Sequence, residues 1–222
     1  MKLTNLSKIL IFLYFINLFL YSFASLMGMS ATLVTFFWAI RIPILFVLYL
    51  VSSKKRQLLY LFALLLYQLA SIYFYLGTTS GLIYGTIYSV FFKAFLVLMI
   101  FDVVTKKNRL ASGIASIPFF IFFLYLFEIV ISSLDKIYFT WIINALLTSF
   151  IGGVGIINYM NNSDKKSFWL LISGILFVVQ IGAFFITKFY IKNESINQIV
   201  ILSYAISHFT FYKFLILKEE EK

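Results

Sequence analysis

The basic residues of this chain are concentrated at its two ends and in every second gap between long apolar runs. A run of about twenty apolar residues can cross the hydrocarbon core of a bilayer, and short loops rich in Lys and Arg stay on the cytoplasmic side. Twelve of the eighteen Lys and Arg residues follow this pattern: Lys2, Lys8, Lys54, Lys55, Arg56, Lys106, Lys107, Arg109, Lys165, Lys166, Lys218 and Lys222. The sequence therefore predicts a polytopic membrane protein with both termini in the cytoplasm.

The apolar runs predict eight transmembrane helices in a single integral membrane domain, residues 1–222. The expected spans are 8–27, 31–52, 57–76, 81–104, 110–131, 137–159, 167–190 and 197–217. Because the connecting segments are short, neighbouring helices are expected to be antiparallel in an all-α bundle. In a bacterium such a protein would lie in the plasma (inner) membrane.

The two ends of the chain need separate interpretation. A signal peptide is the alternative for the first span, since Lys2 and Lys8 precede an apolar run and 22–24 offers a small-x-small cleavage site. The apolar run continues past that site to Met27, which favours a span. The charged tail 218–222 is expected to be a solvated end.

Composition excludes several function classes. The chain is 63% hydrophobic and only 12% charged, whereas charged residues make up about a quarter of a soluble domain. The net charge is +10, but the Lys and Arg residues lie between the spans and do not form one basic face. No nucleic-acid partner is therefore expected. With no cysteine and one histidine, thiol chemistry is excluded and neither a metal nor a cofactor is expected. Membrane lipid is the expected partner.

Polar residues inside the spans are the candidate functional residues, because ionisable groups in a membrane are costly and usually face the bundle interior. Counting from the span ends at 1.5 Å per residue puts most of them in one layer near the midplane. Glu128 lies nearer the outer face, and Tyr204 lies one turn before His208. The seven candidates for a polar cavity are Arg41, Gln68, Lys93, Glu128, Gln180, Tyr204 and His208.

The charges of these candidates favour an anionic ligand. Arg41 and Lys93 are two cations against one acid, which leaves a deficit that an anion such as a phosphate would fill. The alternative is that the polar side chains only form interhelical hydrogen bonds that fix packing. No nucleophile–base–acid set can be read from the spacing, so the catalytic residues, if the protein has any, are unknown.

The last two spans carry a family resemblance. Residues 174–180, then Lys188 and Phe189, then 203–208 are similar to the closing segment of the YhhN family of lysoplasmalogenase-like membrane proteins. Arg41 and Pro43 resemble the family's second helix, and the similarity extends over roughly residues 35–215. The resemblance implies an eight-span fold and hydrolysis of the vinyl-ether bond of lysoplasmalogens.

The departures from the family's motifs affect its chemistry. The family's Gly-Asp falls on Ala70 and Ser71, its Ser-Asp falls on Gln180 and Ile181, its helix-four His falls near Phe92, and its final Gln falls on His208. Without both acids, general acid–base hydrolysis of the ether loses its proton donor and acceptor. A divergent member that no longer hydrolyses the vinyl ether is therefore expected.

Three functions remain open from the sequence, and they leave enzymatic activity undecided. The first is binding of a lipid or anionic amphiphile without hydrolysis. The second is a lysolipid hydrolase that uses another constellation, such as His208 with Gln180 or Glu128. The third is a small transporter, which the lack of clear repeats and paired broken helices disfavours.

Overall fold

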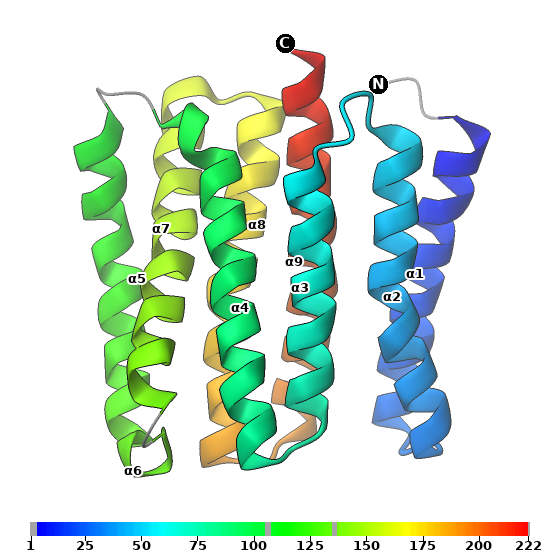
Figure 1. Ribbon diagram of the computed structural model, residues 1–222, viewed down its shortest axis with the longest axis vertical. Coiled ribbons are helices and arrows are strands. Elements are labelled where there is room, and N and C mark those ends of the chain that lie inside the picture. The colour runs from blue at the N-terminus through cyan, green and yellow to red at the C-terminus, as the bar shows by residue number, and fades with distance from the viewer. Residues whose placement is uncertain (1–3, 105–107, 135–136, 222) are drawn as a thin grey trace.

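The protein is a bundle of long helices in a computed structural model that describes residues 4–104, 108–134 and 137–221. Eight helical segments in these ranges are long and apolar enough to span a membrane, which confirms the predicted number and makes this a multi-pass membrane protein. They are α1 (Asn5–Leu26), α2 (Ala31–Ser52), α3 (Leu58–Tyr75), α4 (Thr79–Ile100), α5 (Arg109–Ile129), α7 (Tyr138–Asn162), α8 (Lys165–Phe185) and α9 (Glu194–Glu220). Figure 1 shows them side by side, running alternately up and down.

Short elements complete several of these helices. A 3₁₀ turn, η1 (Phe101–Val103), continues α4, a π-helical segment, η4 (Ile186–Tyr190), continues α8, and the one-turn helix α6 (Ile131–Leu134) follows α5. When η1 and η4 are included, every predicted span agrees with its helix within three residues at each end. The predicted loop and terminal residues Lys2, 105–107, Lys136 and Lys222 lie outside the described residues.

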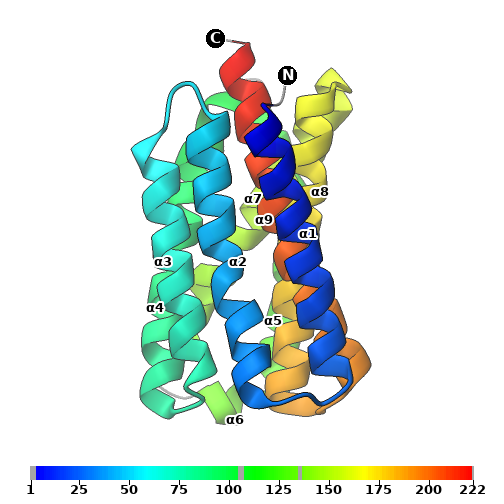
Figure 2. The ribbon, with the colours of Figure 1, turned by 90° about the vertical axis from the view of Figure 1, so that its right-hand side faces the viewer.

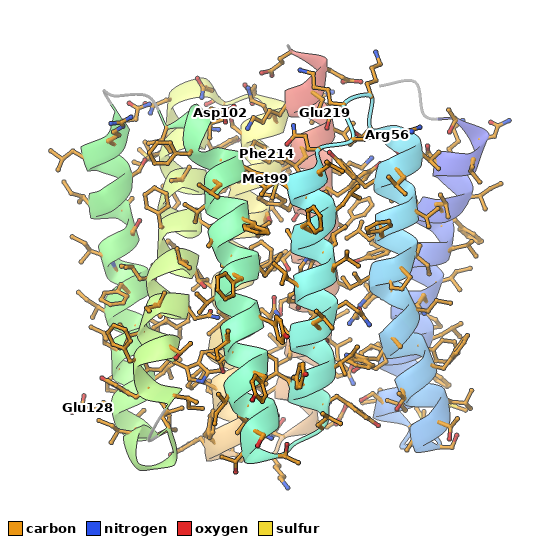
Figure 3. The ribbon with its side chains drawn as sticks, viewed as in Figure 1. Arg56, Met99, Asp102, Glu128, Phe214 and Glu219 are labelled. Atoms are coloured by element: carbon orange, nitrogen blue, oxygen red, sulfur yellow. The ribbon has the colours of Figure 1, made fainter. Side chains whose placement is uncertain are left out.

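The start of α1 and the end of α9 lie at one end of the bundle, the top in Figures 1 and 2, together with the α2–α3 and α7–α8 connections. We call this the basic end, since Lys54, Lys55, Arg56, Lys165 and Lys166 belong to it. Arg56, Asp102 and Glu219 are labelled there in Figure 3, and Glu128 is labelled near the opposite end. The alternation of basic loops along the sequence therefore corresponds to a concentration of basic residues at one end of the bundle.

Local sequence explains where several helices begin and turn. The side chains of Thr4, Thr78, Asp164 and Asn193 accept hydrogen bonds from backbone N–H groups three residues later, at the starts of α1, α4, α8 and α9. These are the residue types that satisfy the free N–H groups of a first helical turn. The turns after α1 and α3 place Gly28 at φ 60° and Gly77 at φ 67°, a conformation that glycine adopts without steric cost.

Small residues bring α5, α7 and α8 into close contact. A Cβ added to Gly153 of α7 would lie 2.6 Å from the carbonyl oxygen of Ser112 in α5. A Cβ on Gly174 of α8 would lie 3.0 Å from the carbonyl oxygen of Ile151 in α7. Such close backbone approach is typical of helix packing in membranes, where dispersion contacts hold helices together.

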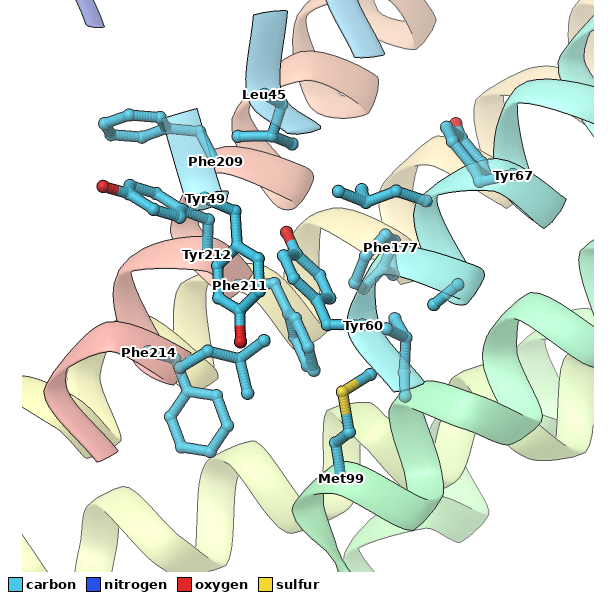
Figure 4. Close-up of a cluster of buried hydrophobic side chains, with 14 of the residues drawn as sticks. Leu45, Tyr49, Tyr60, Tyr67, Met99, Phe177, Phe209, Phe211, Tyr212 and Phe214 are labelled. Atoms are coloured by element: carbon cyan, nitrogen blue, oxygen red, sulfur yellow. The ribbon is translucent and has the colours of Figure 1, made fainter. Parts of the chain in front are cut away.

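The last helix, α9, lies at the centre of the packing. It contacts α8 extensively and also contacts α1 and α2. Its residues Phe211, Tyr212 and Phe214 belong to a buried cluster that includes Tyr60 of α3 and Phe177 of α8 (Figure 4). Aromatic rings from helices far apart in sequence therefore meet around α9, which fixes its position in the bundle.

The prediction that residues 218–222 form a solvated tail is wrong for Lys218 and Glu219, because α9 continues through them and buries both. Lys218 Nζ contacts Asp102 Oδ1 at 2.5 Å. Glu219 accepts hydrogen bonds from Tyr49 OH at 2.9 Å and from Ser53 Oγ at 2.8 Å. The carboxylate of Glu219 thereby satisfies donors at the end of α2 and holds α9 against the α2–α3 connection.

Candidate functional site

A partly open cavity of about 220 Å³ lies among seven of the spans, all but α5. Four of the predicted site residues line it: Arg41, Lys93, Gln180 and Tyr204. The other lining residues are Tyr21, Trp38, Tyr67, Ser71, Phe74, Tyr75, Ser89, Phe92, Trp141, Phe177, Ile181, Phe184, Asn197, Val200 and Ile201. Within the part of the chain that the structure describes, no acidic residue lines this cavity.

Arg41 supplies a buried cation to the cavity. It is the eleventh residue of α2, counted from Ala31, and only 1% of its surface is exposed. Its Cζ lies 3.9 Å from the ring centroid of Tyr204 and 5.1 Å from that of Tyr21. These cation–π contacts stabilise the charge by about 2 kcal/mol when desolvated. The Nε and Nη1 atoms are buried and have no hydrogen-bond partner among the described residues.

Lys93 supplies a second basic group from α4 and is 3% exposed. Its Nζ donates a hydrogen bond to Asn144 Oδ1 at 3.1 Å, and Asn144 Nδ2 donates to Ser89 Oγ at 2.8 Å. The Nζ atom lies 5.9 Å from the ring centroid of Phe177. No ion pair joins Lys93 or Arg41 to a carboxylate of the described residues, so two buried basic groups share a cavity without a protein counter-ion.

Gln180 and Tyr204 join the polar groups across the cavity. Gln180 Nε2 donates to Tyr67 OH at 2.9 Å, while Gln180 Oε1 is buried without a partner among the described residues. Tyr204 OH and Ser71 Oγ are 3.4 Å apart. Since the Tyr204 ring also stacks on Arg41, the tyrosine links the cation of α2 to the polar group of α3.

Three of the seven predicted residues do not line the cavity. Gln68 instead donates to Ala39 O at 3.3 Å and so ties α3 to α2. Glu128 is exposed on α5, near the end of the bundle opposite the basic end (Figure 3). It lies outside the cavity because α5 is absent from the lining, so Glu128 is not a partner for Arg41 or Lys93.

His208 lies behind the cavity and not in it. It is 1% exposed, and its ring centroid is 3.9 Å from Tyr67, 5.2 Å from Phe92 and 5.3 Å from Phe177. Its Nε2 atom has no hydrogen-bond partner among the described residues. The imidazole therefore packs under the rings that form the cavity wall, which is a position for a structural residue.

Sequence reasoning missed the aromatic part of the lining. Trp38, Trp141 and Tyr67 border the cavity, but aromatic side chains are so frequent in this chain that no spacing marked these three. Trp141 Nε1 is a buried donor without a partner among the described residues. Indole N–H groups usually find a partner when buried, so an unpaired one beside a cavity is a signal that only the structure provides.

The cavity extends toward the end of the bundle opposite the basic end. Tyr75, the last residue of α3, and Asn197, near the start of α9, border it there. Trp38 stacks on Tyr75 with ring centroids 5.1 Å apart, and Tyr75 OH lies 2.7 Å from Thr35 Oγ1. Tyr75 is 55% exposed, so the aromatic residues at this end form the border between the cavity and the outside of the protein.

Comparison with known proteins found no match to a family model, to a curated protein or to a solved structure. The interpretation of the cavity therefore depends on its own chemistry. It offers a guanidinium, an amine, two amides and hydroxyl groups in an aromatic shell. This set can bind an anion, but it contains no described carboxylate to act as general acid or base.

Proposed function

We propose that this multi-pass membrane protein binds the anionic head group of a lipid or other amphiphile in the cavity. The observation that carries the proposal is Arg41, whose buried Nε and Nη1 atoms have no partner among the described residues. A buried charge is costly unless it is paired and hydrogen-bonded. A phosphate or carboxylate would complete the hydrogen bonds of Arg41 and offset its charge together with that of Lys93.

The size of the cavity favours a head group over a whole lipid. Pockets for drug-sized ligands have volumes of roughly 300–1,000 Å³, and this one has about 220 Å³. An amphiphile would place its charged group beside Arg41 and leave its chain outside, past the exposed Tyr75. Aromatic residues suit such an entrance, because their rings tolerate both apolar chains and polar head groups.

We also propose that the chain is a divergent relative of the YhhN family. The positions at which the resemblance places the family's acids, Ser71 and Ile181, both border the cavity, and so does Phe92 at the position of the family's histidine. A serine and an isoleucine cannot deliver and accept protons as two carboxylates do. The purified protein should therefore release no aldehyde from a lysoplasmalogen, and robust turnover would favour the hydrolase alternative.

A binding experiment tests the anion site. Protein in neutral maltoside micelles is titrated with dodecyl phosphate while tryptophan fluorescence is followed, since Trp38 and Trp141 line the cavity. Arg41→Gln should weaken binding about tenfold, because a hydrogen bond to a charged group contributes about 1.5–3 kcal/mol. Lys93→Gln should also weaken it. Arg109→Gln, at the exposed start of α5, is the matched control and should change nothing.

Two results would contradict the anion site. One is unchanged dodecyl phosphate binding in the double variant Arg41→Gln, Lys93→Gln. The other is equal binding of dodecyl phosphate and of a neutral dodecyl amphiphile by the unsubstituted protein. Native mass spectrometry of the purified protein then identifies any amphiphile that is retained from the membrane.

We further propose that the basic end faces the cytoplasm, since its Lys and Arg residues resist translocation. A matched pair of Ser→Cys variants tests this in a chain without native cysteine. Ser30, before α2, and Ser163, before α8, are both exposed and lie at opposite ends of the bundle. An impermeant thiol reagent added to intact cells should label Ser30→Cys and not Ser163→Cys, and the reverse pattern would invert the topology.

A further inference from the structure

Lys93 differs from Arg41 in one chemical respect, which is that an amine can lose its proton and act as a nucleophile whereas a guanidinium in a protein does not. Lys93 lines the cavity and makes one hydrogen bond to a described residue, the neutral acceptor Asn144 Oδ1. Phe92, Trp141 and Phe177 also line the cavity, and the Lys93 Nζ lies 5.9 Å from the ring centroid of Phe177. Buried lysine amines in apolar surroundings are the ones that form covalent intermediates with carbonyl compounds.

A neutral covalent product would suit this environment. An ammonium without a counter-ion in an apolar cavity carries a desolvation cost. Release of its proton to solvent gives the neutral amine that reacts, and the imine formed from this amine is neutral as well. The groups that face the amine are also neutral: Asn144 of α7 accepts its hydrogen bond and in turn donates to Ser89 of α4, and the ring of Phe177 of α8 lies 5.9 Å from Nζ. The unpaired donor of Trp141 and the unpaired acceptor of Gln180 leave polar positions on the cavity wall for a ligand.

We propose that Lys93 forms a Schiff base with a small aldehyde that also carries an anionic group, with the anion held by Arg41. The proposal rests on the proposed function, since the anion uses the same guanidinium. Lys93 Nζ adds to the carbonyl carbon to give a carbinolamine. The carbonyl oxygen then leaves as water with both hydrogens of the amine, and a C=N bond forms, so no oxidant or reductant is needed.

Reductive trapping tests the covalent site. Purified protein in neutral micelles is incubated with 4-carboxybenzaldehyde and sodium cyanoborohydride, which reduces an imine to a stable amine. Peptide mapping by mass spectrometry should find Lys93 modified about tenfold faster than Lys213, a half-buried lysine of α9 that lies beside Phe209 and Tyr212. Even labelling over the lysines of the chain, with no preference for Lys93, would overturn the Schiff-base site.

Substitutions at Lys93 provide a second test. Lys93→Arg keeps the charge and the reach of the side chain but removes the nucleophile, so the modification should disappear from this peptide and the total mass shift should fall by one adduct. Lys213→Arg is the matched control and should leave the Lys93 adduct in place. Because the mapping on the unsubstituted protein needs no variant, the test holds even if Lys93→Arg does not fold.

A matched pair of aldehydes separates this inference from the proposed function. Benzaldehyde lacks the carboxylate of 4-carboxybenzaldehyde, and it should label Lys93 more slowly. In Arg41→Gln the carboxylate aldehyde should lose its advantage, so that the ratio of the two labelling rates falls toward one. Equal rates for both aldehydes, with Lys93 still selectively labelled, would overturn the anion site alone. Dodecyl phosphate binding that depends on Arg41, without any Lys93 adduct, would overturn the Schiff-base site alone.

Discussion

The helix α9 and the α1–α2 hairpin are bound to the rest of the bundle in different ways. In the most apolar 18-residue stretch of each helix, 72% of the residues are buried in α9 but only 22% in α1. Packing therefore holds α9 in place, whereas α1 makes few packing contacts. Polar bonds connect α1 to α9 instead: Tyr14 OH donates to Ala205 O at 2.8 Å, and Ser22 Oγ donates to Gln198 Oε1 at 2.5 Å.

Arg41 lies where the two regions meet. α2 belongs to the loosely packed hairpin, and its arginine reaches the well-packed α9 at Tyr204. The seam between this hairpin and the rest of the bundle borders the cavity, to which α1 and α2 contribute Tyr21, Trp38 and Arg41. The hydrogen bonds that Tyr49 and Ser53 donate to Glu219 close the same seam at the basic end, and these three residues do not line the cavity.

The largest expected difference between the two regions is in packing. Phe211→Ala in α9 removes a ring that is 1% exposed and should lower the free energy of unfolding by about 3 kcal/mol. Phe12→Ala in α1 removes a ring that is 65% exposed and should change it little. Unfolding in mixed micelles by increasing fractions of dodecyl sulfate measures both, and equal losses would mean that α1 is packed as firmly as α9.

The next largest effect concerns the bonds at the basic end. Glu219→Gln keeps the shape of a buried side chain but removes the charge that accepts from Tyr49 and Ser53, and should cost about 1–2 kcal/mol in the same measurement. Glu128→Gln makes the same change on an exposed side chain and should cost nothing measurable. Equal behaviour of the two variants would show that the Glu219 contacts do not hold the seam closed.

A smaller effect is expected for a single polar bond of the hairpin. Tyr14→Phe removes the hydroxyl that donates to Ala205 O and should destabilise the protein by about 0.6 kcal/mol, the average for interhelical hydrogen bonds in membranes. Tyr125→Phe on the exposed face of α5 is the control. If Tyr14→Phe costs as much as Phe211→Ala, polar bonds and not packing dominate the attachment of α1.

The smallest effect is a pH dependence at the start of α8. Burial raises the pKa of the Asp164 carboxyl, but hydrogen bonds from Ser167 and the charge of Lys166 lower it more, so the pKa lies below its ordinary value. The stabilisation is therefore present above the ordinary pKa of an aspartate and is lost as the pH falls through the lowered value. Asp164→Asn should reduce this acid dependence of stability, by about 0.5 kcal/mol at most.

The start of α1 offers the control for that experiment. Thr4 caps α1 through its hydroxyl, which accepts from Ser7 N at 3.1 Å, and a hydroxyl does not titrate in this range. Thr4→Ala should therefore lower stability by a similar amount at every pH. A pH-dependent effect of Thr4→Ala would show that the acid transition of the protein does not come from Asp164.

The spans could be predicted from the sequence because apolar length and loop charge are local properties. Arg41 and Lys93 could also be placed in the interior, since an ionisable residue in a span has few other options. Glu128 is exposed and does not line the cavity, because depth along a helix says nothing about which face of α5 points inward. The aromatic wall, with Trp38 and Trp141, depends on which helices become neighbours, and the sequence carries no such signal.

Hydrogen bonds between helices that are distant in sequence could not be predicted from the sequence either. Nothing around Glu219 in the sequence distinguishes it from Glu220 and Glu221, yet the length of α9 brings it beside Tyr49 and Ser53. Gln68 shows the converse: its depth along α3 puts it in the layer of the cavity residues, but its amide donates to Ala39 O of α2 and does not line the cavity. In both residues the rotation of a helix about its own axis decides the outcome, and periodicity in an apolar span does not report it.

The central place of α9 has a consequence for biosynthesis. A ribosome makes this helix after the other seven spans, so α1, α2 and α8 enter the membrane before the helix that they contact exists. Until then Arg41 has no Tyr204 to lie against, and Tyr14 has no Ala205 to bond. During synthesis the surfaces of α1, α2 and α8 that later contact α9 are therefore uncovered. Lipid, water or the insertion machinery has to cover them until α9 is inserted.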